Sequence, residues 1–282
     1  MNEVLPAFWS ERVDRLMLGI EPRDALGGGR IALPIAVALD GIPAFPDARS
    51  AARLARGGAA AWDDLFGLPD AIGGLQPITR HDSCRHALLY RPGMTGPVAI
   101  RLFDRRRRYV PRRISYPLPA DIGVASPRVR LPALFPGAAY ISGDSATGMR
   151  GRVTWNKPAT GEVPVRWARV EATINGVPVG HAHGDDRGEF LLLLDGQAGG
   201  LGDLASPITA TVTVYAPAAP PAQVPGDPLG DLPLEKLLAD PDVISPGLTR
   251  PPGYASTPQS SRPVDFPLGQ LLTRQPKFFL HP

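Results

Sequence analysis

The sequence contains few of the features that mark secreted or membrane-spanning chains. Cys84 is its single cysteine, so no disulfide can form within the chain and no oxidising compartment is indicated. The longest apolar run covers residues 31–39, includes Pro34 and is too short to cross a bilayer. The first sixteen residues carry three acidic side chains and no apolar core, unlike a secretion signal. We therefore expect a cytoplasmic protein without a membrane span, or one that is released within an extracellular particle.

Lysine is almost as scarce as cysteine. Only Lys157, Lys236 and Lys277 occur, so arginine supplies 27 of the 30 basic side chains. The formal net charge is +3, which is too small to indicate a strong basic field for nucleic acid. We interpret the arginine bias as a consequence of coding composition and expect no nucleic-acid partner.

Sequence motifs for catalysis are also missing. The chain has no phosphate-binding loop, no dinucleotide-binding glycine pattern after a strand, no HExxH and no pair of CxxC motifs. His81 and His86 flank Cys84, but we interpret Cys84 as a buried thiol, because proximity in sequence does not establish a catalytic pair. Gly143–Ser145 matches only the start of a lipase-type GDS motif. We expect no enzyme activity and no cofactor, and we keep a hydrolase built on Ser145 as the weakest alternative.

Glycine and proline are abundant instead. Together they make 65 of the 282 residues, or 23%, against about 12% in ordinary proteins. Inside a helix they cost roughly 1 and 3 kcal/mol each, which excludes helix bundles and argues against a TIM barrel. The 43% hydrophobic content excludes global disorder. We predict a mainly β protein with two strand-rich units and an extended proline-rich C-terminal arm.

The first strand-rich unit is predicted to cover residues 1–118. It begins with a short helix after Pro6 within residues 1–20, and residues 47–62 also have helical character. Strands are predicted where apolar and polar residues alternate, because alternate residues of a strand face the same side of a sheet. These strands are residues 31–39, His86–Arg91, Val98–Phe103 and Val110–Leu118, with Asp104–Arg108 as a hairpin loop.

An ordered connector, residues 119–149, is predicted to lead into the second unit, residues 150–217. The connector is predicted to be ordered because it carries apolar side chains that need burial, at Val129, Leu131, Leu134, Phe135, Tyr140 and Ile141. In the second unit, Asn175-Gly176 indicates a two-residue hairpin, because both positions of a type I′ turn need positive φ. Short strands separated by turns predict an antiparallel β-sandwich. They are Arg152–Trp155, Val165–Ile174, Val177–His183, Phe190–Leu194 and Ile208–Tyr215.

The C-terminal arm, residues 218–282, has its own composition. The last 66 residues hold 15 of the 34 prolines and show no sustained periodicity, which predicts extended backbone with one helix at Leu232–Leu238. Many apolar residues are scattered through it, so we expect it to pack along its own units or along a partner. The candidate partner-binding residues are Phe266, Leu271, Leu272, Phe278, Phe279 and Leu280.

Two polar groups could carry binding. His181 and His183 share one face of a predicted strand and precede Asp185, so these three are weak candidates for metal ligands. The alternative is a solvent-facing pair of histidines followed by turn chemistry. A run of four arginines in the predicted hairpin could meet an acidic protein surface or nucleic acid, or it could be a solvated tip that blocks edge aggregation. These arginines are Arg105, Arg106, Arg107 and Arg108.

Part of the second unit resembles the carboxypeptidase regulatory-like (transthyretin-like) domain. The residues that carry the resemblance are Arg150–Thr154, Pro164–Val170, Gly184–Leu191 and the strand ending at Tyr215, about 70 of the 282 residues. The resemblance implies a noncatalytic seven-stranded sandwich that serves as a spacer or attachment unit. The long insertion at Gln197–Pro207 departs from the family pattern.

The wider layout is similar to cap or adaptor proteins of contractile, phage-tail-like injection systems. Val110–Ile114, Leu134–Tyr140 and the run HGDDRGEFLLLL carry this second resemblance. It implies a noncatalytic structural subunit, oligomeric in a complex with other protein subunits. The alternative is a stand-alone module that binds glycan or peptide through exposed aromatic side chains, with Trp9, Trp62, Trp155 and Trp167 as candidates.

Overall fold

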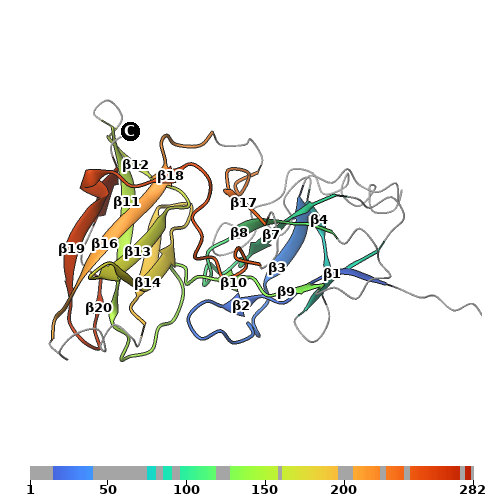
Figure 1. The fold of residues 1–282 in the computed structure, drawn as a ribbon, viewed down its shortest axis with the longest axis horizontal. Coiled ribbons are helices and arrows are strands. Elements are labelled where there is room, and N and C mark those ends of the chain that lie inside the picture. Colours follow the sequence, from blue (N-terminus) through green and yellow to red (C-terminus); the bar gives the residue numbers. More distant parts are fainter. Residues whose placement is uncertain are drawn as a thin grey trace, which may run out of the picture.

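The fold is mainly β, as predicted. The computed structural model describes residues 15–40, 75–80, 85–90, 96–118, 128–157, 161–195, 206–222, 227–237, 242–273 and 277–280. These residues form two groups of sheets that lie side by side along the long axis of the molecule (Figure 1). They contain no α-helix, only a short 3-10 turn. No helix among these residues is therefore long and apolar enough to span a membrane.

The N-terminal unit consists of three small sheets. Its strands are β1 (Leu16–Ile20), β2 (Arg23–Asp24), β3 (Ala36–Asp40), β4 (Leu75–Pro77), β5 (Thr79–Arg80), β6 (His86–Leu89), β7 (Val98–Phe103), β8 (Arg112–Tyr116), β9 (Val129–Arg130), β10 (Ala133–Leu134) and β17 (Leu234–Lys236). The sheet orders are β17-β8-β7-β3-β4, β5-β6-β1-β9 and β10-β2. Ile100, Leu102 and Ile114 are completely buried in its core.

Local alternation predicted most of these strands. β7 covers the predicted residues, and β6 and β8 lie within the predicted ranges. The strand predicted over residues 31–39 begins only at Ala36, after Pro34. The helix predicted within residues 1–20 is wrong for its last five residues, which form β1 because Leu18 and Ile20 enter the core of the N-terminal unit. Residues 1–14 and 47–62 lie outside the described part of the chain.

The second unit is the predicted β-sandwich. Its strands from this part of the chain are β11 (Gly148–Lys157), β12 (Gly161–Pro164), β13 (Arg169–Ile174), β14 (Val177–His183), β15 (Glu189–Leu193) and β16 (Ile208–Pro217). β11 pairs with β12 and β15 in one sheet, and β13 lies between β14 and β16 in the other. The side chains of Trp155, Phe190 and Val212 meet in the core. Asn175 and Gly176 have φ angles of 50° and 79°, which confirms the hairpin turn.

The C-terminal segment is where the structure departs from the predicted arm. β17 adds to the N-terminal unit, parallel to β8, whereas β18 (Tyr254–Ala255) and β19 (Ser261–Phe266) pair with β16. β20 (Leu271–Leu272) and β21 (Lys277–Leu280) pair with β11 in parallel. The helix predicted at Leu232–Leu238 is wrong, because β17 occupies its centre. A short 3-10 turn, η2 (Pro258–Ser260), precedes β19.

The connector is ordered where it is described, but only part of its apolar surface is covered. Leu134 and Phe135 are buried, as predicted. Val129 and Leu131 are exposed, and Ile141 is 91% exposed, so the expectation of burial is wrong for these three side chains. Tyr140 is half-buried and donates its hydroxyl hydrogen bond to Asp24.

Candidate functional site

Ion pairs, hydrogen bonds and apolar packing join the two units at their junction. The C-terminal segment runs from β17 to β18 between the two groups of sheets (Figure 1). A small hydrophobic core fills the junction, with side chains from both units and from this segment. Its members are Ala38, Phe103, Val110, Trp167, Leu229 and Leu232. The C-terminal segment therefore joins the units by burial as well as by strand pairing.

Glu235, in β17, is the centre of this junction. Its side chain is 1% exposed and accepts two hydrogen bonds from Arg112, at 3.0 Å from Nε and 2.7 Å from Nη2. Arg169, from the sandwich, approaches Glu235 at 3.4 Å. Arg112 also donates to the carbonyls of Ala133, Ile244 and Ser245. One carboxylate thus connects arginines from both units.

The two arginines respond differently to their burial. Burial lowers the pKa of Arg112, but the bidentate contact with Glu235 more than compensates and leaves that pKa raised. The pKa of Arg169 is lowered, because the longer contact with Glu235 does not offset the loss of solvation and Arg112 repels it. Glu235 therefore stabilises Arg112 more strongly than Arg169.

Asp231 forms a second connection in the same segment. Its side chain is 1% exposed and accepts hydrogen bonds from the indole Nε1 of Trp167 at 2.9 Å and from the guanidinium of Arg166. Arg166 also donates to the carbonyl of Pro228. The carbonyl of Trp167 accepts a hydrogen bond from the hydroxyl of Tyr254. The sandwich therefore contacts the C-terminal segment both before β17, at Asp231, and at β18, through Tyr254.

The predicted arginine hairpin between β7 and β8 contributes to the junction rather than forming one basic surface. Arg107 has a φ of 55° and pairs with Asp186 of the β14–β15 turn, across the two units. Arg108 pairs with the buried carboxylate of Asp104. Arg105 and Arg106 are exposed. The four arginines are thus divided between internal pairing and the surface, and their proposed role toward a partner stays a prediction.

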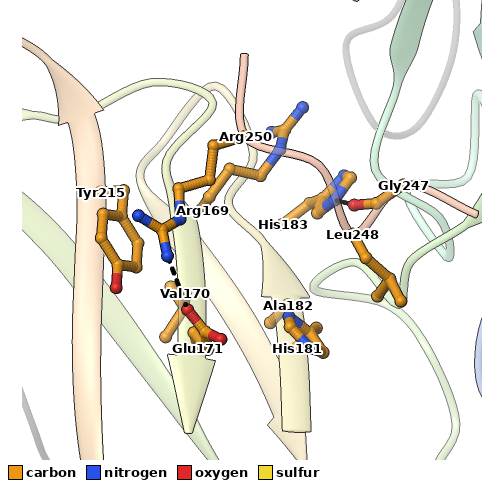
Figure 2. Close-up of a pocket in the computed structure, with 10 residues that line it drawn as sticks. All are labelled: Arg169, Val170, Glu171, His181, Ala182, His183, Tyr215, Gly247, Leu248 and Arg250. Carbon is orange, nitrogen blue, oxygen red and sulfur yellow. Dashed lines mark hydrogen bonds and ion pairs between the residues drawn. The ribbon is translucent and has the colours of Figure 1, made fainter. Parts of the chain in front are cut away.

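Strand β14, which carries His181 and His183, lies beside a small hollow (Figure 2). The hollow holds about 20 Å³, little more than one water molecule. Arg250 lies 3.8 Å from the ring centre of Tyr215 and 3.4 Å from the carboxylate of Glu171. His181, which is opposite Glu171 in the strand register, also lines it. Its lining residues are Arg169, Val170, Glu171, His181, Ala182, His183, Tyr215, Gly247, Leu248 and Arg250.

His183 is occupied by structural contacts. Its Nε2 lies 2.8 Å from the carbonyl oxygen of Gly247, and its ring stacks on Phe135 at 4.1 Å. Burial, together with the neighbouring Arg169 and Arg112, holds its pKa well below the usual value, so the ring is neutral at physiological pH. A side chain at Gly247 would lie 2.8 Å from the ring of Phe135, which accounts for glycine at this contact.

Asp185, the third candidate ligand, holds the β14–β15 turn. Its Oδ1 accepts hydrogen bonds from the backbone N–H groups of Arg187 and Glu189. Its Oδ2 is buried without a hydrogen-bond partner, 3.8 Å from Arg107. Burial, with the nearby charge of Asp186, raises its pKa to about 6. Among the described residues no three potential ligands come together, so the geometry gives the metal candidates no support.

Several other candidates lie in the core or outside the described residues. Phe266 and Phe278 are buried in the sandwich, which leaves them no surface for a partner. Leu271 and Leu272 are half-buried in β20, and their partner-binding role stays a prediction. Phe279 and Leu280 have backbone in β21, and their side chains are outside the description. Cys84, His81, Trp9 and Trp62 lie outside the described residues. Ser145 is exposed in a turn.

Sequence reasoning missed Glu235, Asp231, Arg112 and Arg169. Only a weak signal was available: acidic residues are interspersed with leucines and prolines in residues 227–242. The partners Glu235 and Arg112 are 123 residues apart, so no local spacing could pair them.

No family model and no curated protein matches this chain. Two solved structures were found, and their sequence identities are very low. The Bacillus anthracis TIE protein has 10% identity and a TM-score of 0.25, over 95% of this chain and 34% of its own. GBS52, the minor pilin of Streptococcus agalactiae, has 9% identity and a TM-score of 0.25, over 95% of this chain and 97% of its own. The chain spans about a third of the length of the first, and these TM-scores are too low to support an argument about function.

Proposed function

We propose that this chain is a noncatalytic structural or adaptor subunit of a larger protein assembly. The observation that carries the proposal is the junction at Glu235. Two β units are held by one buried carboxylate, a shared core and a segment that pairs with a sheet of each unit. Such a construction keeps two surfaces at a fixed separation, which a connecting subunit requires.

The size of two hollows in the described part of the chain also supports a role without a small-molecule substrate. The hollow at His181 holds about 20 Å³, and one beside Arg107, Trp167 and Asp185 holds about 10 Å³. Sites for small molecules usually enclose about 300–1,000 Å³. Each of these hollows is therefore the size of a water site.

The specific assembly we propose is a contractile, phage-tail-like injection particle, in which the chain acts as a cap or adaptor. This part of the proposal rests on the sequence resemblance of Val110–Ile114, Leu134–Tyr140 and residues 183–194. The alternative, a glycan- or peptide-binding module, required exposed aromatic side chains. Trp155 and Trp167 are each 1% exposed, so neither can serve as such a platform.

The proposal is tested by cross-linking in the source cells, followed by purification of the tagged full-length chain and mass spectrometry. We expect the same few proteins in fixed ratio, including sheath or tube proteins if the injection-particle assignment is right. A variant with a weakened junction, Glu235→Gln, should recover less of them than the exposed control Glu162→Gln at equal abundance. Recovery of the wild-type chain as a monomer with no stoichiometric partner would overturn the proposal.

A further inference from the structure

Three arginines converge on one carboxylate at an end of sheet β5-β6-β1-β9. Glu21 directly follows β1 and is 1% exposed. It pairs with Arg23, with Arg30 at 3.2 Å and with Nε of Arg85 at 2.5 Å. We name Glu21, Arg23, Arg30 and Arg85 the Glu21 cluster.

The strand arrangement brings the members of the Glu21 cluster together from three segments. The backbone N–H of Glu21 donates to the carbonyl of Arg130, which fixes the residue at the end of β1. Arg23 and Arg30 face each other across an isolated antiparallel bridge. Arg85 directly precedes β6, whose first residue His86 pairs with Ile20. The three guanidinium groups are therefore positioned by backbone pairing around one acceptor.

The charges of the Glu21 cluster do not balance. Three arginines against one carboxylate leave a net charge of +2. Around Asp40 the acidic partners are more plentiful: Arg101 and Arg113 share Asp40, and Arg101 also binds Asp227. No second acidic side chain contacts the three arginines among the residues that the structure describes. Like charges held this close repel one another, which favours binding of an anion.

Donor groups remain available in the Glu21 cluster. Arg85 uses Nε, and the described residues give its two terminal nitrogens no partner. Arg30 binds through a single terminal nitrogen. The Nε of Arg23 is buried without a hydrogen-bond partner. The side chains of Arg23, Arg30 and Arg85 are 32%, 42% and 52% exposed, so a small anion can reach them from solvent.

Glu21 holds its negative charge and so keeps the arginines in place. Burial alone would raise its pKa, but the hydrogen bonds from Arg85 and Arg30 and the charge of Arg23 outweigh it and lower the pKa. The carboxylate is therefore ionised throughout the neutral range. It neutralises one guanidinium and leaves two positive charges for a ligand.

We propose that the Glu21 cluster binds a phosphate dianion, either free or as the terminal group of a small phosphate monoester. A dianion matches the net charge of +2, and its oxygens accept the remaining guanidinium donors in the geometry for which arginine is suited. The site is separate from the Glu235 junction and does not depend on the proposed function.

The test is isothermal titration of the full chain with inorganic phosphate at pH 8 and constant ionic strength, repeated with glycerol phosphate. We expect saturable binding to the wild-type chain and to the exposed control variant Arg105→Gln. Arg85→Gln and Arg30→Gln should each bind at least about tenfold more weakly, since a charged hydrogen bond contributes about 1.5–3 kcal/mol. The affinity for glycerol phosphate should decrease when the pH is lowered below about 6, the second pKa of a phosphate monoester, because the ligand then loses its second negative charge.

Hydrogen exchange on the wild-type chain provides a second readout that needs no variant. Phosphate should slow exchange at residues 21–30 and 85–88 and leave β16 unchanged. The proposal is overturned if the wild-type chain gives no saturable binding, or if both arginine variants bind as tightly as the Arg105→Gln control. Binding of phosphatidic acid vesicles without binding of free phosphate would likewise contradict a small-molecule site.

Discussion

At the scale of single residues, the chain uses arginine where a lysine would not serve. Arg112 reaches both oxygens of Glu235 and three backbone carbonyls from a completely buried position. A planar guanidinium with five donors can satisfy that many acceptors, and an ammonium group cannot. The interpretation of the arginine bias as coding composition alone is therefore incomplete, because much of the arginine in the described chain forms specific pairs.

Replacing Glu235 by glutamine removes the charge that compensates Arg112 and Arg169. We expect Glu235→Gln to lower the free energy of unfolding by about 3–5 kcal/mol, because it leaves buried charges without a partner. Urea unfolding followed by circular dichroism measures this change. The exposed Glu162→Gln variant should change stability by less than about 0.5 kcal/mol. Equal effects of the two substitutions would contradict the role of Glu235.

The raised pKa of Asp185 predicts a pH dependence. Its pKa is about 6 in the folded chain against 3.8 ordinarily, so its contribution to stability is complete below pH 3.8 and is lost as pH rises through 6. Relative to Asp185→Asn, which keeps an acceptor for the turn, the wild-type chain should gain about 1 kcal/mol of stability between pH 7 and pH 5. Urea unfolding of both proteins at the two pH values tests this. A difference that is constant or shrinks on acidification would exclude the assignment.

At the scale of elements, the C-terminal segment was predicted as an extended arm, but in the structure it contributes strands to three sheets. β19 shows how a strand that contains a proline can join a sheet, because Pro263 lies on an edge strand where no further ladder hydrogen bond is needed. Phe266 and Phe278 supply large side chains to the sandwich core. The apolar residues that suggested a sticky arm are in large part core residues of the same chain.

Sequence predicted the elements that depend on local signals. The turn at Asn175-Gly176 and the strand Val98–Phe103 can be recognised from neighbouring residues alone, and both were predicted correctly. β17 is three residues long, and its strand conformation depends on pairing with β8, more than a hundred residues earlier. For the same reason the Glu21 cluster and the Glu235 junction could not be predicted, since their members meet only after the sheets form.

β21 offers the clearest test at this scale. Phe278 is 2% exposed, lies 6.0 Å from the ring centre of Phe190, and has Arg262 over its face. Phe278→Ala should cost about 3–5 kcal/mol of unfolding free energy, as expected for a buried phenylalanine. Leu268→Ala, at an exposed position of the same segment, should be nearly neutral. If both variants unfold at the same urea concentration as the wild-type chain, β21 is not part of the core.

At the scale of the whole molecule, the C-terminal segment makes two units into one body. A chain that ends after Pro217 lacks β17 to β21 and the side chains that they bury. We expect this truncated chain to be expanded and to unfold without cooperativity. Size-exclusion chromatography and near-ultraviolet circular dichroism measure both properties. If the truncated chain is compact and unfolds cooperatively, the C-terminal segment is not required for folding.

The central claim is that the two β units form one rigid, cooperative body through the Glu235 junction. Scanning calorimetry of the full chain tests it most directly. A single transition is predicted, with calorimetric and van't Hoff enthalpies equal within error. Two separated transitions, or a calorimetric enthalpy well above the van't Hoff value, would show that the units fold independently and would contradict the account.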